Sequence, residues 1–407
     1  MDRRQFRDFD TGLLASAAAL VGVGILMVYS ATHGAADASL AGLPQKQAIF
    51  AVAGLIAMAV ALFVSQDTLE ALSPFIYAVA LVLLVAVLIV GVGKTGERRW
   101  FELGPLRLQP SELAKYATVF LLARWLARKK TRLERVTDLD VPIMIVLVPF
   151  GLVLREPDLG TSLMFVFILL PMLYWAGARP LLLLLLLAPV VSMVLSFHLF
   201  AWIVFLVALA AFLYVSSILL LDKVILFGAS VLTGRLSPFL WAHLEEYQKH
   251  RILAFLSPEK YRFSTGYQLI QSKIAIGSGS AVGKGFLQGT QKNYAFLPEQ
   301  HTDFIFSVLG EEFGFLGCAV VLALYIYLVF RMLHIASQAR NRYAGLVVVG
   351  IASALFLQSA VNIGVTLGLS PVTGMPLPLL SYGGTSLLVT MTAIGVVLGM
   401  GLRRMEY

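Results

Sequence analysis

The densest group of ionisable side chains stands where the chain enters a long apolar run. Glu299, His301, Thr302 and Asp303 precede or open this run, and Glu311-Glu312 follows about two turns later. A carboxylate beside a histidine at the edge of a membrane cavity can act as the general base for a hydroxyl group. The alternative is structural: Thr302 or Asp303 only caps the next helix, because both residue types are preferred at that position.

A second group couples a carboxylate to a lysine inside a predicted helix. Glu112 and Lys115 are three residues apart in the run Gln109-Pro110-Ser111-Glu112-Leu113-Ala114-Lys115, so they share a helix face and can pair. Ionisable residues within membrane spans generally line polar cavities. We therefore favour a cavity role for Glu112 and Lys115. The alternative is that Ser111 caps the helix and the pair neutralises itself at the membrane interface.

Two further segments interrupt the apolar pattern. Pro157-Asp158-Leu159-Gly160 separates two short runs, and Pro and Gly both favour a break there. Short, broken spans point to a site inside a membrane protein. Asp158 also suits the N-cap of the following helix, and the two roles are compatible. The Gly- and Pro-rich stretch 368–384 either lines the same cavity or forms a purely structural re-entrant turn, since irregular backbone needs protein around it at membrane depth.

Several other kinds of site are excluded by the residues present. The run 277–285 resembles a phosphate-binding loop, but Gly285 follows Lys284 where that motif requires Ser or Thr, so we expect a flexible loop. No nucleophile elbow and no paired-histidine zinc motif occurs. Cys318 is the only cysteine, which excludes an intrachain disulfide and a multi-cysteine metal site.

The elements that position these groups are membrane helices. The 407 residues are 59% hydrophobic and 13% charged, against about 45–50% and about 25% in soluble domains. The mean hydropathy is +0.85. Runs near the length of a membrane helix predict an all-α polytopic membrane protein with about twelve spans. The runs are 11–31, 46–64, 73–93, 111–127, 141–154, 160–176, 181–197, 199–221, 223–243, 303–333, 342–366 and 384–402.

The distribution of basic residues predicts the orientation. With both termini in the cytoplasm, clusters of basic residues fall in the short inner segments, as the positive-inside rule requires. They are Arg3, Arg4, Arg7, Arg128, Lys129, Lys130, Arg132, Arg135, Arg331, Arg340, Arg342, Arg403 and Arg404. The outer loop with Lys94, Arg98, Arg99 and Arg107 is also basic, which suggests an anionic ligand. The chain forms one membrane domain over 1–407 with a long extracytoplasmic loop at 244–302, and Glu245–Phe263 suits a helix in the interface plane.

Six ordered blocks resemble the SEDS family (shape, elongation, division and sporulation) of cell-wall polymerases. They are Arg99-Trp100 with Gly104-Pro105, the run from Gln109 to Lys115, Pro157-Asp158-Leu159-Gly160, the run from Gln271 to Gly279, the run from Pro298 to Phe306, and Ser381-Tyr382-Gly383-Gly384. Within that family, 296–301 and 371–378 are most similar to the RodA proteins of cell elongation. The resemblance covers 10–176 and 237–405. It implies ten helices, so 181–236 is predicted to contain an inserted helical hairpin.

The resemblance implies a peptidoglycan glycosyltransferase in the bacterial inner membrane that polymerises lipid II. Asp303 matches the essential aspartate of the family and would be the general base of an inverting reaction. Arg99, Lys115 and Lys273 are candidates for binding the diphosphate leaving group, and a divalent cation (Mg²⁺ or Mn²⁺) is the candidate cofactor. Glu112 would hold Lys115, while Asp158 and His301 would line the cavity. The implied partners are a class B penicillin-binding protein and other membrane proteins of the elongation complex, with no nucleic acid. The alternative function is a lipid II flippase.

Overall fold

The computed structural model describes residues 9–33, 40–93, 98–104, 106–128, 133–263, 265–290 and 299–403. The predicted cations Lys94, Lys129, Lys130, Arg132 and Arg404 lie outside these residues, as do Arg3, Arg4 and Arg7. The same holds for 291–298, which carries part of one family motif.

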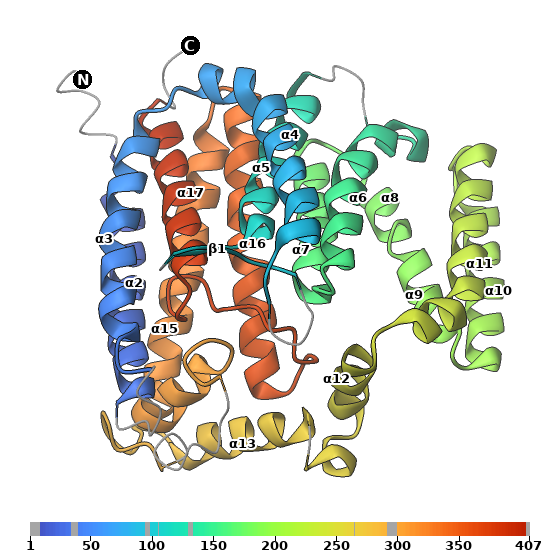
Figure 1. The fold of residues 1–407 in the computed structure, drawn as a ribbon. Helices are drawn as coiled ribbons and strands as arrows, with labels where there is room; N and C mark the ends of the chain where they lie inside the picture. Colours follow the sequence, from blue (N-terminus) through green and yellow to red (C-terminus); the bar gives the residue numbers. More distant parts are fainter. Residues whose placement is uncertain are drawn as a thin grey trace.

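The described chain is mostly helical and forms a bundle of apolar helices (Figure 1). The first half contains α2 (Thr11–Thr32), α3 (Leu43–Leu62), α4 (Gln66–Val90), α5 (Pro110–Arg128), α6 (Asp140–Arg155), α7 (Leu159–Trp175), α8 (Pro180–Leu185) and α9 (Ala188–Leu195). The second half contains α10 (Leu199–Val215), α11 (Leu220–His243), α12 (Glu246–Leu256), α13 (Thr265–Ser278), α15 (Ile305–Gln338), α16 (Arg342–Leu367) and α17 (Gly384–Leu402). Short 3₁₀ helices, η3 (Val136–Leu139) and η4 (Pro258–Tyr261), complete the set.

Eight stretches of these described residues are long and apolar enough to cross a membrane. The prediction of an all-α, multi-pass membrane protein is therefore confirmed. Each of the apolar runs corresponds to a helix or, at 181–197, to the pair α8 and α9. The number of helices that cross the bilayer stays a prediction, because α7, α8–α9 and α10 are shorter.

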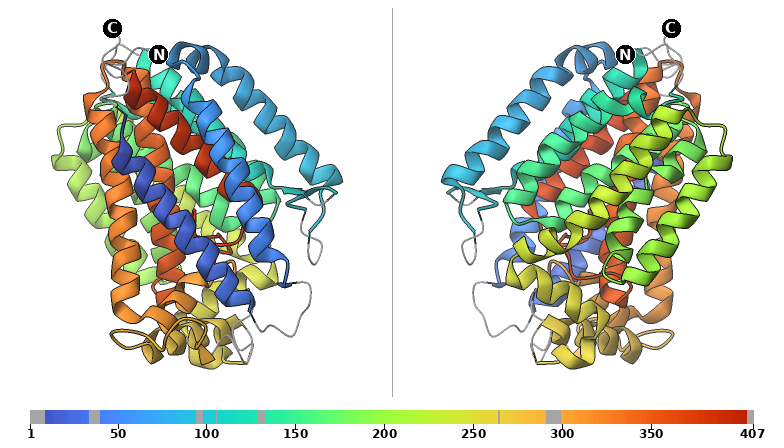
Figure 2. Two further views of the ribbon diagram at one scale, coloured as in Figure 1. Left: turned by 90° about the vertical axis from the view of Figure 1, so that its left-hand side faces the viewer. Right: turned by 90° about the vertical axis from the view of Figure 1, so that its right-hand side faces the viewer.

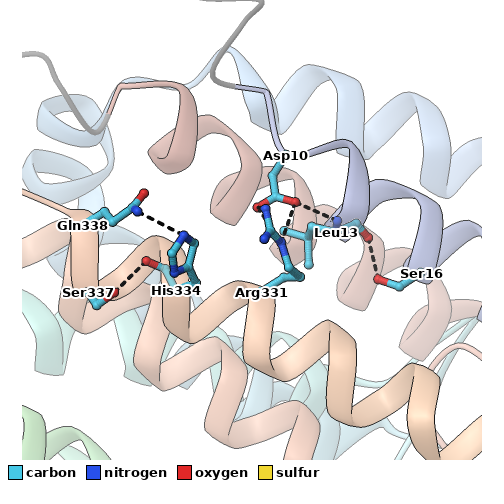
Figure 3. Close-up of polar contacts among 7 residues, drawn as sticks. All are labelled: Asp10, Leu13, Ser16, Arg331, His334, Ser337 and Gln338. Carbon is cyan, nitrogen blue, oxygen red and sulfur yellow. Dashed lines mark hydrogen bonds and ion pairs between the residues drawn. The ribbon is translucent and has the colours of Figure 1, made fainter.

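Helices α16 and α17 form the centre of the bundle, and most of their residues are buried. The start of α2 and the end of α17 lie at one end, while α12 and α13 lie at the other (Figures 1 and 2). At the first end, Arg331 of α15 binds Asp10 through two nitrogens, with Nη2 to Oδ2 at 2.7 Å (Figure 3). Asp10 also accepts the main-chain N–H of Leu13, so one carboxylate caps α2 and fixes α15 beside it.

Helices α8 to α11 stand beside the main bundle (Figure 1). They are held to one another at membrane depth by buried polar contacts, among them Trp202 Nε1 to Ser192 Oγ at 2.8 Å. Asp222 of α11 accepts the main-chain N–H of Val136 at 3.1 Å, which ties the unit to η3. This unit contains the predicted hairpin region 181–236, whose status as an insertion stays a prediction.

Helix α4 begins seven residues earlier than the apolar run 73–93 indicates. Ser65 caps it, and Pro74 is tolerated inside it. Proline cannot donate the helical hydrogen bond to the carbonyl four residues before it. Here that carbonyl belongs to Glu70, and it accepts from Ser73 Oγ and from Arg124 Nη1, each at 2.9 Å. Side chains thus replace the missing bond, which a reading of the sequence could not anticipate.

The basic outer loop after α4 also differs from a purely helical prediction. Strands β1 (Phe101–Leu103) and β2 (Leu106–Leu108) form a small antiparallel hairpin. Glu102 lies opposite Arg107, and their side chains form an ion pair at 2.9 Å. The hairpin leads directly into α5.

Helix α15 is kinked at Gly314, whose φ of 63° lies in the left-handed region. The kink leaves main-chain groups of α15 without their helical hydrogen-bond partners, and the backbone of the glycine-rich loop 279–285 supplies partners instead. Four main-chain hydrogen bonds of 2.9–3.0 Å join the two segments: Lys284 to Glu311, Gly285 to Glu312, Phe315 to Ser280, and Leu316 to Ala281. The expectation of a flexible loop is therefore wrong, because the loop backbone completes the helix.

Side chains reinforce this junction. Lys284 Nζ lies 2.7 Å from Glu311 Oε1, and that oxygen also accepts the main-chain N–H of Thr290 at 2.8 Å. Ser30 of α2 donates to Glu312. Both glutamates are buried, with 1% exposure each. We call this group, Lys284, Thr290, Glu311 and Glu312 with Ser30, the α15 junction.

Candidate functional site

Polar side chains gather at the end of the bundle that carries α12 and α13. Four segments meet there: the break between α6 and α7, helix α12, the turn at 299–304 before α15, and the irregular segment 368–383. The sequence predicted the break and the turn as parts of one site, and it left 368–383 as either cavity lining or a structural turn. Helix α12 is the additional component.

Asp303 lies in the turn before α15. The N-cap residue of α15 is Phe304, and no side chain caps this helix, so the alternative role of Thr302 or Asp303 as a cap is excluded. Both main-chain polar groups of Asp303 are hydrogen-bonded. Its N–H donates to the carbonyl of Glu299 at 3.1 Å, and its carbonyl accepts from Asn362 Nδ2 at 3.1 Å. The carboxyl group is therefore positioned but is not used for capping.

The charge of Asp303 is controlled by burial and by Arg251 of α12. Burial raises the pKa of the Asp303 carboxyl from 3.8 to about 6, the Arg251 guanidinium lowers it, and Glu299 raises it. A β-carbon at Gly374 would lie 3.6 Å from Arg251 Nη1 and 3.8 Å from Asp303 Oδ2, so both groups flank this glycine. With a pKa of about 6, the carboxyl is mostly ionised at pH 7 and still basic enough to accept a proton.

Asp158 has both of the roles considered for it. It caps α7, because Thr161 donates its main-chain N–H to Oδ1 at 3.1 Å and its hydroxyl to Oδ2 at 2.9 Å. Gln109 also donates to Oδ2, at 3.4 Å. The negative charge of Asp158 raises the pKa of Asp303, which places the two carboxylates in one electrostatic site.

Arg99 reaches this site from the outer loop. Its Nε donates to the carbonyl of Glu156 at 3.0 Å, and its Nη2 donates to the carbonyl of Pro157. Nη2 also lies 3.3 Å from the hydroxyl of Tyr247 on α12, which itself donates to Pro157 O. Arg99 and Tyr247 therefore bind the two carbonyls that the break leaves without helical partners.

Glu156 is completely buried at the same break. Neither of its carboxyl oxygens has a hydrogen-bond partner among the described residues. Burial raises the pKa of Glu156 from 4.5 to about 9, Asp158 raises it further, and Arg99 lowers it. Glu156 is therefore a neutral acid at pH 7.

Glu112 and Lys115 form a deeper layer. Lys115 Nζ lies 2.9 Å from Glu112 Oε1 and 2.6 Å from Gln358 Oε1, and the lysine side chain is 1% exposed. Gln358 Nε2 donates to the carbonyl of Pro376 at 2.9 Å. The predicted ion pair is thus present and is buried inside the bundle, not at a solvated helix end.

Helix α16 connects this deeper layer to Asp303. Asn362, one turn after Gln358, donates to the carbonyls of Met375 at 2.7 Å and Asp303 at 3.1 Å. Gln358, Asn362 and Arg251 did not emerge from the sequence as site residues. Two amide side chains one turn apart in an apolar span are a signal that identifies the first two, because polar side chains in spans usually bond between helices.

His301 and Lys273 lie at the periphery of the site. His301 Nε2 is 3.9 Å from Glu299 Oε2, its ring centroid is 6.0 Å from that of Tyr382, and its carbonyl accepts the N–H of Tyr382. The exposed Lys273 rests on Gly368 at the C-terminal end of α16, where a β-carbon would lie 2.1 Å from Lys273 Cε. No hydrogen bond or ion pair within the described chain joins Lys273 to Asp303 or Arg99.

The carboxylates of the site do not form a metal-ligand set. Within the described ranges, no three His, Cys, Asp or Glu side chains lie close enough together to hold an ion. Asp158 accepts bonds from Thr161 and Gln109, Glu156 is neutral, and Asp303 faces Arg251. Because Mg²⁺ is usually held by only one or two carboxylates together with substrate phosphates, a divalent cation at this site stays a prediction.

Comparison with known proteins gives a consistent result. The family model described as "Cell cycle protein", covering FtsW, RodA and SpoVE, matches residues 11–208 and 183–404. Peptidoglycan glycosyltransferase MrdB of Escherichia coli K12 is 36% identical over 381 residues, covering 93% of this chain and 91% of its own.

Solved structures agree with the fold. A chain from a peptidoglycan synthase complex, described as coordinating polymerization and crosslinking, superposes with a TM-score of 0.74 at 31% identity over 98% of this chain and 99% of that chain. The crystal structure of the rod shape determining protein RodA of Thermus thermophilus gives a TM-score of 0.64 at 29% identity over 98% of both chains. With the family model matching nearly the whole chain, this protein belongs to the FtsW–RodA–SpoVE family of cell cycle proteins, the SEDS family.

Proposed function

We propose that the protein is a peptidoglycan glycosyltransferase of the bacterial inner membrane that polymerises lipid II during cell elongation. The observation that carries this proposal is the Asp303 carboxyl, which belongs to a residue that is half-buried, held by its main chain and not used as a helix cap. Relatives named peptidoglycan glycosyltransferase match nearly the whole chain, which supports the same chemistry.

In this proposal, Asp303 accepts the proton of the acceptor 4-hydroxyl group as its oxygen attacks the anomeric carbon of the donor sugar. The bond between that carbon and the diphosphate oxygen breaks, the configuration inverts, and the lipid diphosphate leaves. Its pKa of about 6 suits this role, because a general base works best when its pKa is near the operating pH. Arg251 keeps the carboxylate ionised.

The leaving diphosphate needs fixed positive charge. Of the three cations predicted for this task, Arg99 lies beside Asp158 and the break, with a partly buried guanidinium. Lys115 is enclosed by Glu112 and Gln358, so we assign it a positioning role through α16. Lys273, exposed at the periphery, would act on the lipid diphosphate only as it enters or leaves.

A class B penicillin-binding protein is the proposed partner. A solved relative is part of a complex described as coordinating polymerization with crosslinking, and crosslinking is transpeptidase chemistry. Other membrane proteins of the elongation complex are proposed on the family resemblance alone.

The test is Asp303→Asn in purified protein with its partner, assayed by glycan polymer formation from lipid II on a gel. Loss of a general base typically costs about 10²–10⁴-fold in rate. Asp140→Asn is the matched control, because Asp140 is exposed at the opposite end of the bundle. The Asp303→Asn variant should retain its melting temperature and partner binding while making no polymer, and the Asp140→Asn control should polymerise lipid II like the wild type. Wild-type polymerisation by Asp303→Asn would overturn the assignment, and retained lipid II transport without any polymerisation by the wild type would favour a flippase.

A further inference from the structure

A groove of about 770 Å³ opens between α4 and α6 on the bilayer-facing side of the bundle. Leu81, Val85 and Ile89 form its α4 wall, while Val148 and Leu152 form its α6 wall. These residues recur at helical spacing, so each helix presents one continuous apolar face to the groove.

With the orientation predicted from the basic residues, the groove lies in the outer leaflet. It ends at Ile89, one residue before the end of α4, and begins at Leu81, about 12 Å away along the helix axis. The hydrocarbon of one leaflet is about 15 Å thick, half of a 30 Å core. A chain lying in the groove would therefore enter from the outer surface and run toward the midplane.

Two arginines stand at the outer end of the groove. Arg155 lines it, is exposed, and makes no hydrogen bond or ion pair in the described chain. Arg98 donates to the carbonyls of Leu88 and Ile89 at 3.0 Å each, and the residue is exposed. Positive charge is disfavoured on this side of the membrane for topology. Guanidinium groups there match a phosphate, which they bind through several N–H donors.

The groove ends at Arg155, the last residue of α6 before the break that forms one side of the site already described. Arg155 directly precedes Glu156 and Pro157, whose carbonyls bind Arg99. A lipid headgroup at Arg155 would therefore lie next to the polar site that contains Asp158 and Asp303. An ordinary phospholipid has no reason to be held at that position, whereas a lipid-linked sugar must remain anchored while its headgroup enters the site.

We propose that the α4–α6 groove binds the isoprenoid chain of a lipid diphosphate, with Arg155 and Arg98 contacting the diphosphate. This proposal rests on the proposed function. It adds a defined position for the lipid anchor, on the bilayer-facing side of the break between α6 and α7.

Gly151 makes the groove testable. A β-carbon added there meets no atom within 4 Å, so Gly151→Leu fills the groove without displacing protein. Gly228 of α11 is equally open and lies outside the groove, so Gly228→Leu is the matched control. Arg155→Gln removes the unpaired charge.

The direct experiment places a photoreactive amino acid at Val85 in the full-length protein and measures crosslinking to undecaprenyl diphosphate in detergent. Crosslinking should be strong, should fall about tenfold in Gly151→Leu and Arg155→Gln, and should be unchanged in Gly228→Leu; such a loss corresponds to about 1.4 kcal/mol of binding. Phosphatidylglycerol is the competitor. Equal capture of phosphatidylglycerol, or no dependence on Gly151 and Arg155, would overturn the proposal.

Kinetics separate this proposal from the proposed function. Gly151→Leu and Arg155→Gln should raise the KM for lipid II with little change in kcat at saturation. Polymerisation with a wild-type KM in both variants would refute the groove while leaving the glycosyltransferase intact. Specific capture of undecaprenyl diphosphate by a protein that makes no polymer would refute the enzyme assignment while leaving the groove.

Discussion

Replacing Glu156 with glutamine should stabilise the protein at neutral pH. The folded protein holds Glu156 protonated, with a pKa of about 9, whereas the unfolded carboxyl has its ordinary value of 4.5. Folding at pH 7 therefore requires the uptake of a proton by a group that is ionised when unfolded. Across the 2.5 units between 4.5 and 7, this costs about 3 kcal/mol. Glutamine has nearly the same shape and carries no charge, so it avoids this cost.

The direction of the pH dependence is fixed by the raised pKa. Since the folded state binds more protons, the contribution of Glu156 to stability is greatest below pH 4.5 and is lost as the pH rises toward 9. The gain from Glu156→Gln should thus be near zero at pH 4.5 and increase steadily through pH 7 to pH 8.5.

Unfolding in detergent, followed by circular dichroism at several pH values, measures this gain. Glu259→Gln is the matched control, because Glu259 is exposed in η4 and should show no stabilisation. Equal stability of Glu156→Gln and wild type at pH 7, with parallel pH profiles, would refute the reasoning. That result would mean that Glu156 is ionised and has a partner in the folded protein.

Three further predictions concern the site and the topology. Arg251→Gln removes the cation that lowers the pKa of Asp303, so the acid limb of the rate profile should move above pH 6, measured as polymer formation against pH. Glu112→Ala and Lys115→Ala each leave a buried charge uncompensated, at a cost of about 3–5 kcal/mol of unfolding free energy. Changing Glu112 to Gln and Lys115 to Met together should cost less. Unfolding measurements compare the three variants, and equal costs would contradict a buried pair. A topology reporter at His198, between α9 and α10, should report the outer side, and a cytoplasmic signal would remove two spans from the bundle.

The break between α6 and α7 shows how far the sequence leads. Pro157 and Asp158 predict both a helix end and a cap, because one lacks an N–H and the other accepts the N–H groups of the next helix. The ion pair of Glu112 with Lys115 follows from their spacing in the same way. These features are local, so composition and spacing contain enough information to predict them.

Arg251 and Gln358 show what spacing cannot supply. Helix α12 reads as an interfacial helix, and only its packing beside the break brings Arg251 to Asp303. Gln358 meets Lys115 across 243 residues of sequence. Lys273 belongs to a family motif yet rests on Gly368, because α13 packs against the end of α16 and not against the break.

The kink at Gly314 has a consequence for how the protein enters the membrane. The part of α15 after the kink, 315–338, is about 24 residues or roughly 36 Å long, enough to cross the 30 Å core alone. The part before it carries Glu311 and Glu312, whose insertion without partners would each cost about 2.5–3.5 kcal/mol. Lys284 forms an ion pair with Glu311, and Ser30 of α2 donates a hydrogen bond to Glu312. Both partners precede α15 in the chain and are therefore translated before it. The two parts of α15 therefore need not enter the membrane as one span, because 315–338 can cross it alone while 305–313 packs against groups that are already in place.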